Sequence, residues 1–141
     1  YSMPKNLKVL VTGGAGYIGS HAVLALKDAG HRPVVVDNLV TGFRWAIPND
    51  VPFVEGNIAD EALLAGTLRD HGIDAIMHFA ANALVGESMQ NPSKYFRNNI
   101  ANGVNLLDAA VEVPLHSTGD ASRRSALLVV RILPIFSLLA P

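Results

Sequence analysis

The sequence contains no cysteine among its 141 residues. Disulfide bonds, thiolate catalysis and zinc–thiolate sites are therefore excluded within it, and the composition is compatible with a reducing cytoplasm. Aromatic residues (6%) and charged residues (16%) are both scarce, and the formal net charge is only −1. We therefore expect a cytoplasmic protein on the cysteine content and, because the chain lacks a basic excess, one that binds a small ligand and has neither nucleic acid nor a membrane as a partner.

Long apolar runs are also missing. The most apolar late segment, residues 126–140, is short and is interrupted by Arg131 and Pro134, which argues against a membrane span. No charged region followed by a long apolar run opens the chain, so no signal peptide is predicted. Tyr1 and Ser2 precede Met3 and are typical of a remnant of an expression vector.

Glycine, by contrast, is concentrated at one place, where an apolar stretch leads into a helical pattern. Gly14, Gly16 and Gly19 fit GxGxxG, and Gly13, Gly16 and Gly19 fit GxxGxxG. Such a turn lets the backbone approach a pyrophosphate while the next helix points its N–H groups at it. Asp37, eighteen residues after Gly19, is the acidic residue expected in this context. The pattern predicts a dinucleotide site, and a glycine turn without a ligand is the alternative.

Hydrophobic periodicity predicts alternating strands and helices. We expect strands over residues 8–12, 33–37, 51–55 and 73–79, and helices over residues 17–29, from an Asp60 cap to about residue 71, and over residues 92–112. A continuous run such as Val34–Val36 is typical of a strand buried on both faces. The prediction is an α/β fold, a Rossmann-type doubly wound parallel sheet with right-handed crossovers.

The character of the chain changes after Glu112. Pro114 breaks the helical pattern, residues 117–124 are polar, and residues 126–133 form an apolar run that fits a strand. We expect this atypical C-terminal tail, residues 113–141, to pair beside the first or the fourth strand. An exposed apolar edge would otherwise invite association, which leaves a homo-oligomer as a candidate assembly.

Several separated motifs, in this order and spacing, resemble the extended short-chain dehydrogenase/reductase family, in its branch of NAD-dependent epimerases and dehydratases. The resemblance runs from residue 3 to about residue 112, which makes that segment a partial NAD-binding Rossmann domain. The motifs are Val11-Thr-Gly-Gly-Ala-Gly-Tyr-Ile-Gly-Ser-His21, Asp37-Asn-Leu39 with Gly42, Phe53-Val-Glu-Gly-Asn57, His78-Phe-Ala-Ala81, Val85-Gly-Glu-Ser88, and Asn91-Pro92 through Tyr95 to Asn98-Asn99.

The resemblance implies a set of cofactor contacts and no metal site. Asp37 would accept hydrogen bonds from the adenosine ribose and repel a 2′-phosphate, which favours NAD over NADP. Asn57 stands where the family usually has an aspartate, and an amide can still hydrogen-bond there without a charge. The implied NAD contacts are Gly13, Gly16, Tyr17, Ile18, Gly19, Asp37, Asn38, Asn57, Ile58, Phe79, Ala80, Ala81 and Asn98.

Some of these residues also have a purely structural interpretation. Asp37 could be a turn or cap residue, Ala80 and Ala81 could serve tight packing, and Asn98 could be a polar surface residue. His78 is expected to be a packed, hydrogen-bonded histidine rather than a catalyst.

The reaction implied by the resemblance is inversion at C4 of a UDP-hexose, in which bound NAD takes a hydride and returns it to the other face. The family uses a tyrosine with a lysine four residues later. The match here, Tyr1 to Lys5, lies ahead of the first strand and contains Pro4, so we regard it as coincidence. We therefore predict no catalytic residue in this chain, which we expect to be a truncated, frameshifted or alternatively ended product that is inactive alone. Another nucleotide-sugar epimerase or dehydratase, and a non-catalytic NAD-binding module, are the alternatives.

Overall fold

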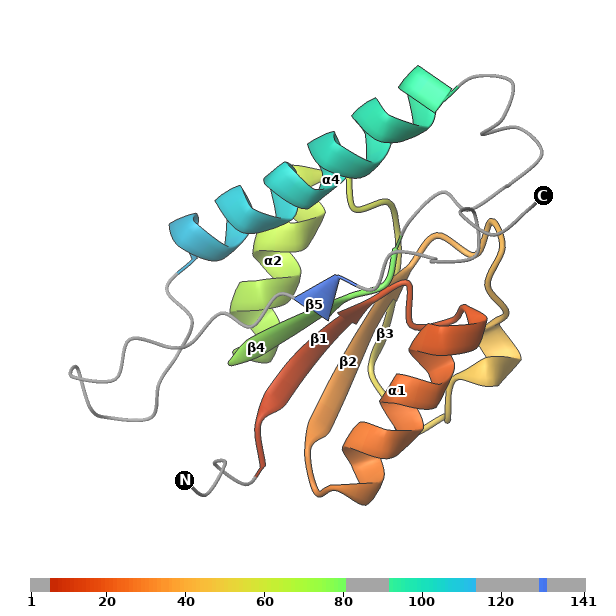
Figure 1. Cartoon of the computed structure of the whole chain (residues 1–141). Coiled ribbons are helices and arrows are strands. Elements are labelled where there is room, and N and C mark those ends of the chain that lie inside the picture. Colours follow the sequence, from red (N-terminus) through yellow and green to blue (C-terminus); the bar gives the residue numbers. More distant parts are fainter. Residues whose placement is uncertain (1–5, 81–91, 114–129, 132–141) are drawn as a thin grey trace.

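The computed structural model describes residues 6–80, 92–113 and 130–131. A parallel sheet in the order β3-β2-β1-β4-β5 is flanked by helices on both faces (Figure 1). The predicted doubly wound α/β architecture is confirmed. The elements are β1 Lys8–Thr12, α1 Tyr17–Asp28, β2 Arg32–Asp37, the 3-10 helix η1 Arg44–Ala46, β3 Phe53–Glu55, α2 Glu61–His71, β4 Ala75–His78, α4 Pro92–Glu112 and β5 Val130–Arg131.

Alternation along β1 divides the core between the two faces of the sheet. Val9 and Val11 pack on the α1 side with Val23 and Val35, whereas Leu10 joins the cluster on the side of α2 and α4. All five of these side chains are buried. A strand enclosed on both faces needs an unbroken apolar sequence, which is what β1 and β2 have.

The predicted stop and start signals position the helices. The Asp60 carboxylate accepts a hydrogen bond from the Leu63 N–H (3.0 Å) at the beginning of α2, and Gly72 follows that helix in the left-handed region at φ 59°. α1 begins at the expected residue and ends one residue early, because Ala29 is its C-cap.

Two predicted strands are shorter in the structure. Val51 donates its N–H to the Pro48 carbonyl (3.0 Å), so this residue belongs to a turn and β3 begins only at Phe53. Ile73 donates to the Leu68 carbonyl (3.2 Å) and so completes the end of α2 rather than starting β4. β2 begins one residue earlier than expected, where the Arg32 N–H donates to the Leu7 carbonyl.

Part of the predicted tail strand lies within the described residues. Val130 and Arg131 pair in parallel with Met77 and His78 of β4. The fourth strand was one of the two expected neighbours. Within residues 6–80 and 92–113, no helix combines the length and apolar character that crossing a bilayer requires.

Candidate dinucleotide site

The glycine-rich loop lies between the carboxyl end of β1 and α1. Gly13 has φ 69° and donates its N–H to the Val36 carbonyl (2.8 Å). A Cβ atom on Gly13 would lie 2.5 Å from the Ala80 nitrogen and 2.8 Å from the Phe79 carbonyl carbon. Only glycine accommodates both the left-handed φ and this approach to the chain after β4.

The loop then turns into α1 without a side-chain cap on the helix. A Cβ on Gly19 would collide with the Gly13 carbonyl and lie 2.8 Å from Gly14 Cα, so the helix packs directly on the turn. Gly16 is the N-cap and supplies no side-chain cap, and the first turn carries no acidic residue. The N–H groups of a first helical turn have no partner within the helix, so this end is suited to bind an anion.

Asp37 joins the loop to the end of β2. Its Oδ2 accepts the Ala15 N–H (2.9 Å) and its Oδ1 accepts the Leu39 N–H (2.8 Å), and the residue is only 8% exposed. Its backbone carbonyl also accepts the Gly56 N–H (3.0 Å) from the chain after β3. The carboxylate oxygens have lone pairs beyond those two bonds, so Asp37 can hold the loop and still accept a ligand hydroxyl.

Two asparagines follow the next strand ends along the same edge. The Asn38 side-chain oxygen accepts the Val40 N–H (3.1 Å), and the Asn57 side-chain oxygen accepts the Ala59 N–H (2.9 Å). Each therefore forms an Asx turn just past the end of its strand, Asn38 directly after β2 and Asn57 two residues after β3, and this turn orients the chain that leaves the sheet. Ile58 differs from the other predicted contacts because its side chain is packed in the core, so only its backbone can face a ligand.

β4 completes the edge on the other side of β1. Phe79 donates its N–H to the Thr12 carbonyl (2.9 Å), and Ala80 lies against Gly13. The buried Thr12 hydroxyl and His78 Nδ1 are 2.5 Å apart, so His78 is packed and hydrogen-bonded, as expected for a structural histidine. Ala81 and the side chain of Asn98 lie outside the described residues.

The sheet order thus brings most of the predicted residues together. β3, β2, β1 and β4 are adjacent and parallel, so their carboxyl ends place Asn57, Asp37, the glycine turn and Phe79 along one edge (Figure 1). The order reverses between β1 and β4, which is where open α/β sheets bind ligands. Tyr17 and Ile18 are exposed at the start of α1 beside this edge.

The sequence patterns did not predict one contact that supports the glycine loop. Phe43 donates its N–H to the Ala15 carbonyl (3.0 Å), and a Cβ on Gly42 would lie 2.9 Å from Ala15. The loop after β2 is therefore fastened to the glycine loop. Gly42 belongs to one of the motifs that carry the family resemblance, but the motif does not indicate that Gly42 packs against Ala15, which is distant in sequence. Among the described residues, no three His, Asp or Glu side chains gather as metal ligands would.

Comparison with known proteins agrees with this geometry. Residues 9–120 match the NAD dependent epimerase/dehydratase family. The chain is 54% identical over 104 residues to UDP-glucose 4-epimerase of Azospirillum brasilense, which covers 74% of this chain and 30% of that protein. A UDP-glucose 4-epimerase of Klebsiella pneumoniae is 42% identical over 110 residues, with 73% of this chain and 79% of that protein covered.

Solved structures give the same result. The structure of UDP-glucose 4-epimerase from Brucella ovis in complex with NAD superposes with a TM-score of 0.71 at 48% identity, over 76% of this chain and 33% of that one. The chain thus spans about a third of the length of most of the relatives it matches. With the glycine turn, Asp37 and the strand order in place, the family resemblance is confirmed: the chain belongs to the NAD dependent epimerase/dehydratase family.

Proposed function

We propose that this chain is the NAD-binding portion of a UDP-glucose 4-epimerase. The observation that carries the proposal is the hydrogen bond from the Ala15 N–H to Asp37 Oδ2 (2.9 Å), which joins the glycine turn, where the phosphates would bind, to the carboxylate that would receive the ribose. The family membership and the relatives' names support the same assignment.

The residues present fit a bound dinucleotide. The absence of Cβ atoms at Gly13 and Gly19 leaves the turn closely packed on β4 and α1, so that the backbone is bare where a pyrophosphate would lie. Tyr17, Ile18 and Gly19 would donate N–H groups to it, and Asp37 with Asn38 would receive the adenosine ribose. Asn57 would face the adenine, while Phe79, Ala80, Ala81 and Asn98 would line the nicotinamide half. NAD, when bound, would supply the hydride acceptor and donor for inversion at C4 of a UDP-hexose.

Calorimetric titration of the purified chain with NAD tests the cofactor assignment. We expect saturable binding at one site, with a weaker response to NADP because Asp37 would repel the 2′-phosphate. Trp45, the only tryptophan, provides a second readout, since it stacks on Phe43, whose N–H is bonded to the glycine loop. Absence of binding by both methods would favour a decayed, non-catalytic module.

An activity assay tests whether this chain can catalyse epimerisation by itself. We expect no conversion of UDP-galactose to UDP-glucose by this chain, because no tyrosine of the described helices is followed four residues later by a lysine that could help it to move the 4-hydroxyl proton. Turnover above the level of a mock purification would contradict this expectation and require a general base that we have not assigned. Turnover of a different nucleotide sugar alone would favour another epimerase or dehydratase of the family.

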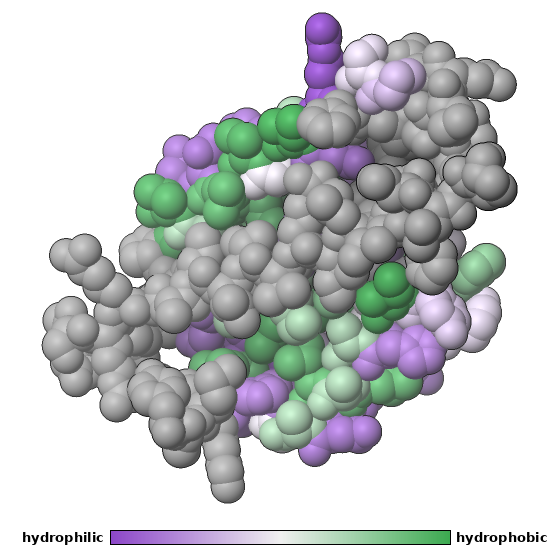
Figure 2. Space-filling model, in the orientation of Figure 1, coloured by the Kyte–Doolittle hydropathy of each residue, from purple (hydrophilic) through white to green (hydrophobic). Residues whose placement is uncertain are grey.

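A homo-oligomer is supported by the outer face of α4. Ile100, Val104, Leu107 and Val111 are exposed at helical spacing, opposite the buried Leu106, Ala109 and Ala110. Figure 2 shows apolar side chains gathered along the side of the molecule where α4 runs. An uncovered apolar stripe of this kind is typical of an association surface.

We expect Leu107→Glu to shift the chain towards the monomer in light scattering after gel filtration. Val40→Glu is the matched control, because Val40 is an exposed apolar residue on the loop after β2. A monomer in the unmodified chain, or an equal shift in both variants, would exclude α4 as the contact.

A further inference from the structure

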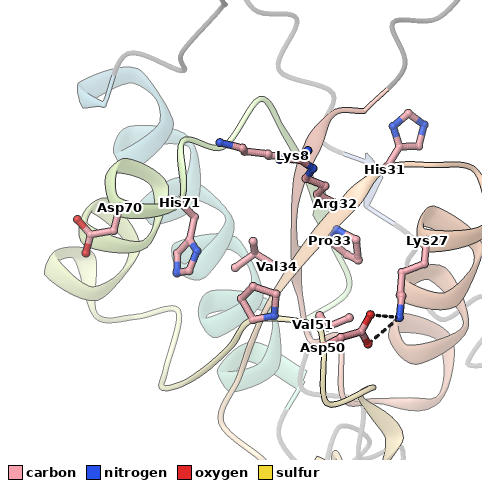
Figure 3. Close-up of a pocket in the computed structure, with 11 residues that line it drawn as sticks. Lys8, Lys27, His31, Arg32, Pro33, Val34, Asp50, Val51, Asp70 and His71 are labelled. Carbon is pink, nitrogen blue, oxygen red and sulfur yellow. Dashed lines mark hydrogen bonds and ion pairs between the residues drawn. The ribbon is translucent and has the colours of Figure 1, made fainter.

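A cavity lies at the amino ends of the strands, at the sheet edge opposite the glycine turn. Its volume is about 450 Å³, and Figure 3 shows residues of β1, β2, α1 and α2 around it. Val34 and Val51 are buried in its wall. None of its lining residues belongs to the proposed NAD site.

Two cations stand side by side at this edge. Lys8 and Arg32 are the first residues of β1 and β2, and they are register partners across the parallel ladder. Register partners in adjacent strands are about 5 Å apart and project to the same face of the sheet. Lys8 and Leu10 share a face, as do Arg32 and Val34, so both cations project on the side of α2.

Within the described residues, no carboxylate neutralises this pair. Neither the Lys8 ammonium nor the Arg32 guanidinium has an ion-pair partner there. Asp74, the carboxylate beside Lys8, accepts the Lys8 backbone N–H (2.9 Å) instead. Two like charges on adjacent strand ends repel each other, and a bound anion would offset that repulsion.

The other charges of the cavity leave this excess in place. Lys27 and Asp50 neutralise each other through hydrogen bonds of 2.6 and 2.7 Å, and Lys27 holds the pKa of Asp50 below its ordinary value. The Asp70 carboxylate points away from the other labelled side chains (Figure 3). Three cations and two carboxylates line the cavity, so its formal charge is +1, whereas the whole chain carries a formal net charge of −1.

Two histidines also line the cavity, and their rings lie on opposite sides of the strands (Figure 3). His31 Nδ1 accepts the Leu7 N–H (3.2 Å), so the proton of the neutral ring is on Nε2, which remains a donor. His71 contributes a second imidazole from the last turn of α2. The Lys8 ammonium and the Arg32 guanidinium are donors of the kind that phosphate oxygens accept, and each imidazole can add one N–H from its own side of the cavity.

We propose that this cavity is a second anion site, which binds the phosphate groups of a small phosphorylated molecule at the edge of the sheet opposite the NAD site. The volume accommodates a pyrophosphate-sized group, and the apolar wall excludes water from one side of it, which strengthens the attraction. This inference does not depend on the proposed function.

Titration of the ¹⁵N-labelled chain with inorganic pyrophosphate, followed by amide chemical shifts, tests the site. We expect saturable shifts at Lys8, His31, Arg32 and His71, which weaken as salt is added. Shifts confined to Gly13–Gly19 would place the anion in the dinucleotide turn and overturn the proposal. Absence of saturable shifts would also overturn it.

Substitution separates binding from a purely structural role. Both Lys8 and His71 lie near the carboxyl end of α2, where cations also stabilise a helix dipole. We expect Lys8→Gln with Arg32→Gln to weaken pyrophosphate binding roughly tenfold, whereas Arg97→Gln, which removes an exposed cation of α4 outside the cavity, leaves it within about twofold. Equal weakening in both proteins would indicate nonspecific charge. A loss of thermal stability in the double variant with unchanged affinity would assign the cations to the helix end alone.

Discussion

Replacing Gly13 with alanine is expected to eliminate measurable NAD binding and to destabilise the fold by about 2–4 kcal/mol. The left-handed φ of 69° alone costs a residue with a Cβ about 1–2 kcal/mol. The new methyl group would in addition lie 2.5 Å from the Ala80 nitrogen, which is backbone and cannot rotate away. The turn or the chain after β4 must move, and the N–H groups aimed at the pyrophosphate move with it. Urea unfolding followed by circular dichroism, with calorimetric titration of NAD, measures both effects.

Gly66→Ala is the matched control for this substitution. Gly66 lies within α2, and a Cβ there would meet no heavy atom within 4 Å. Alanine at an unobstructed helical position stabilises by about 0.5–1 kcal/mol, so we expect unchanged NAD binding and slightly higher stability. A Gly13→Ala protein that binds NAD as the unmodified chain does would show that the turn is not the phosphate site.

Replacing Asp37 is expected to affect stability and cofactor selectivity separately. Asp37→Ala leaves the Ala15 and Leu39 N–H groups without their acceptor, which should cost about 2–4 kcal/mol because the carboxylate is buried. Asp37→Asn keeps one acceptor oxygen and removes the charge, so its loss of stability should be about half as large. The same substitution should raise the affinity for NADP relative to NAD, since the repulsion of the 2′-phosphate is removed.

The comparison of these two variants separates the roles of the carboxylate. Asp28→Asn is the control, because Asp28 is an exposed residue at the end of α1. An unchanged ratio of NAD to NADP affinity in Asp37→Asn, together with the predicted loss of stability, would assign Asp37 to holding the loop alone. An unchanged stability in Asp37→Ala would contradict the two hydrogen bonds.

The local elements could be predicted from short stretches of sequence. Asp60 and Gly72 define α2 because a cap carboxylate and a left-handed glycine act within one helical turn of the residues they affect. The errors lie at strand beginnings, where a local turn or helix-end hydrogen bond competes with strand pairing. Val51 and Ile73 look like strand residues, but hydrogen bonds to Pro48 and Leu68 place them in a turn and at a helix end.

The residues of the candidate site could be predicted from the sequence, but the hydrogen bonds between them could not. Gly13, Gly16, Gly19 and Asp37 are identified by spacing, because each supplies a property that the pattern requires. The bond between Asp37 and the Ala15 N–H was not predictable, nor was the positive φ of Leu39 (57°), because no residue type at those positions demands them.

The sequence alone determined the strand–turn–helix unit, the missing Cβ atoms that leave the turn bare, and the acid at the end of the second strand, because these are properties of single residues and their immediate neighbours. The tertiary structure decided which strand ends lie next to one another. The parallel register of β1 and β2 brings Thr12 beside Val36 at one edge, next to the loop that Asp37 fastens, and Lys8 beside Arg32 at the other. One ladder therefore builds both the proposed cofactor site and the proposed second anion site, because pairing between strands fixes the distance between residues that the chain itself keeps far apart.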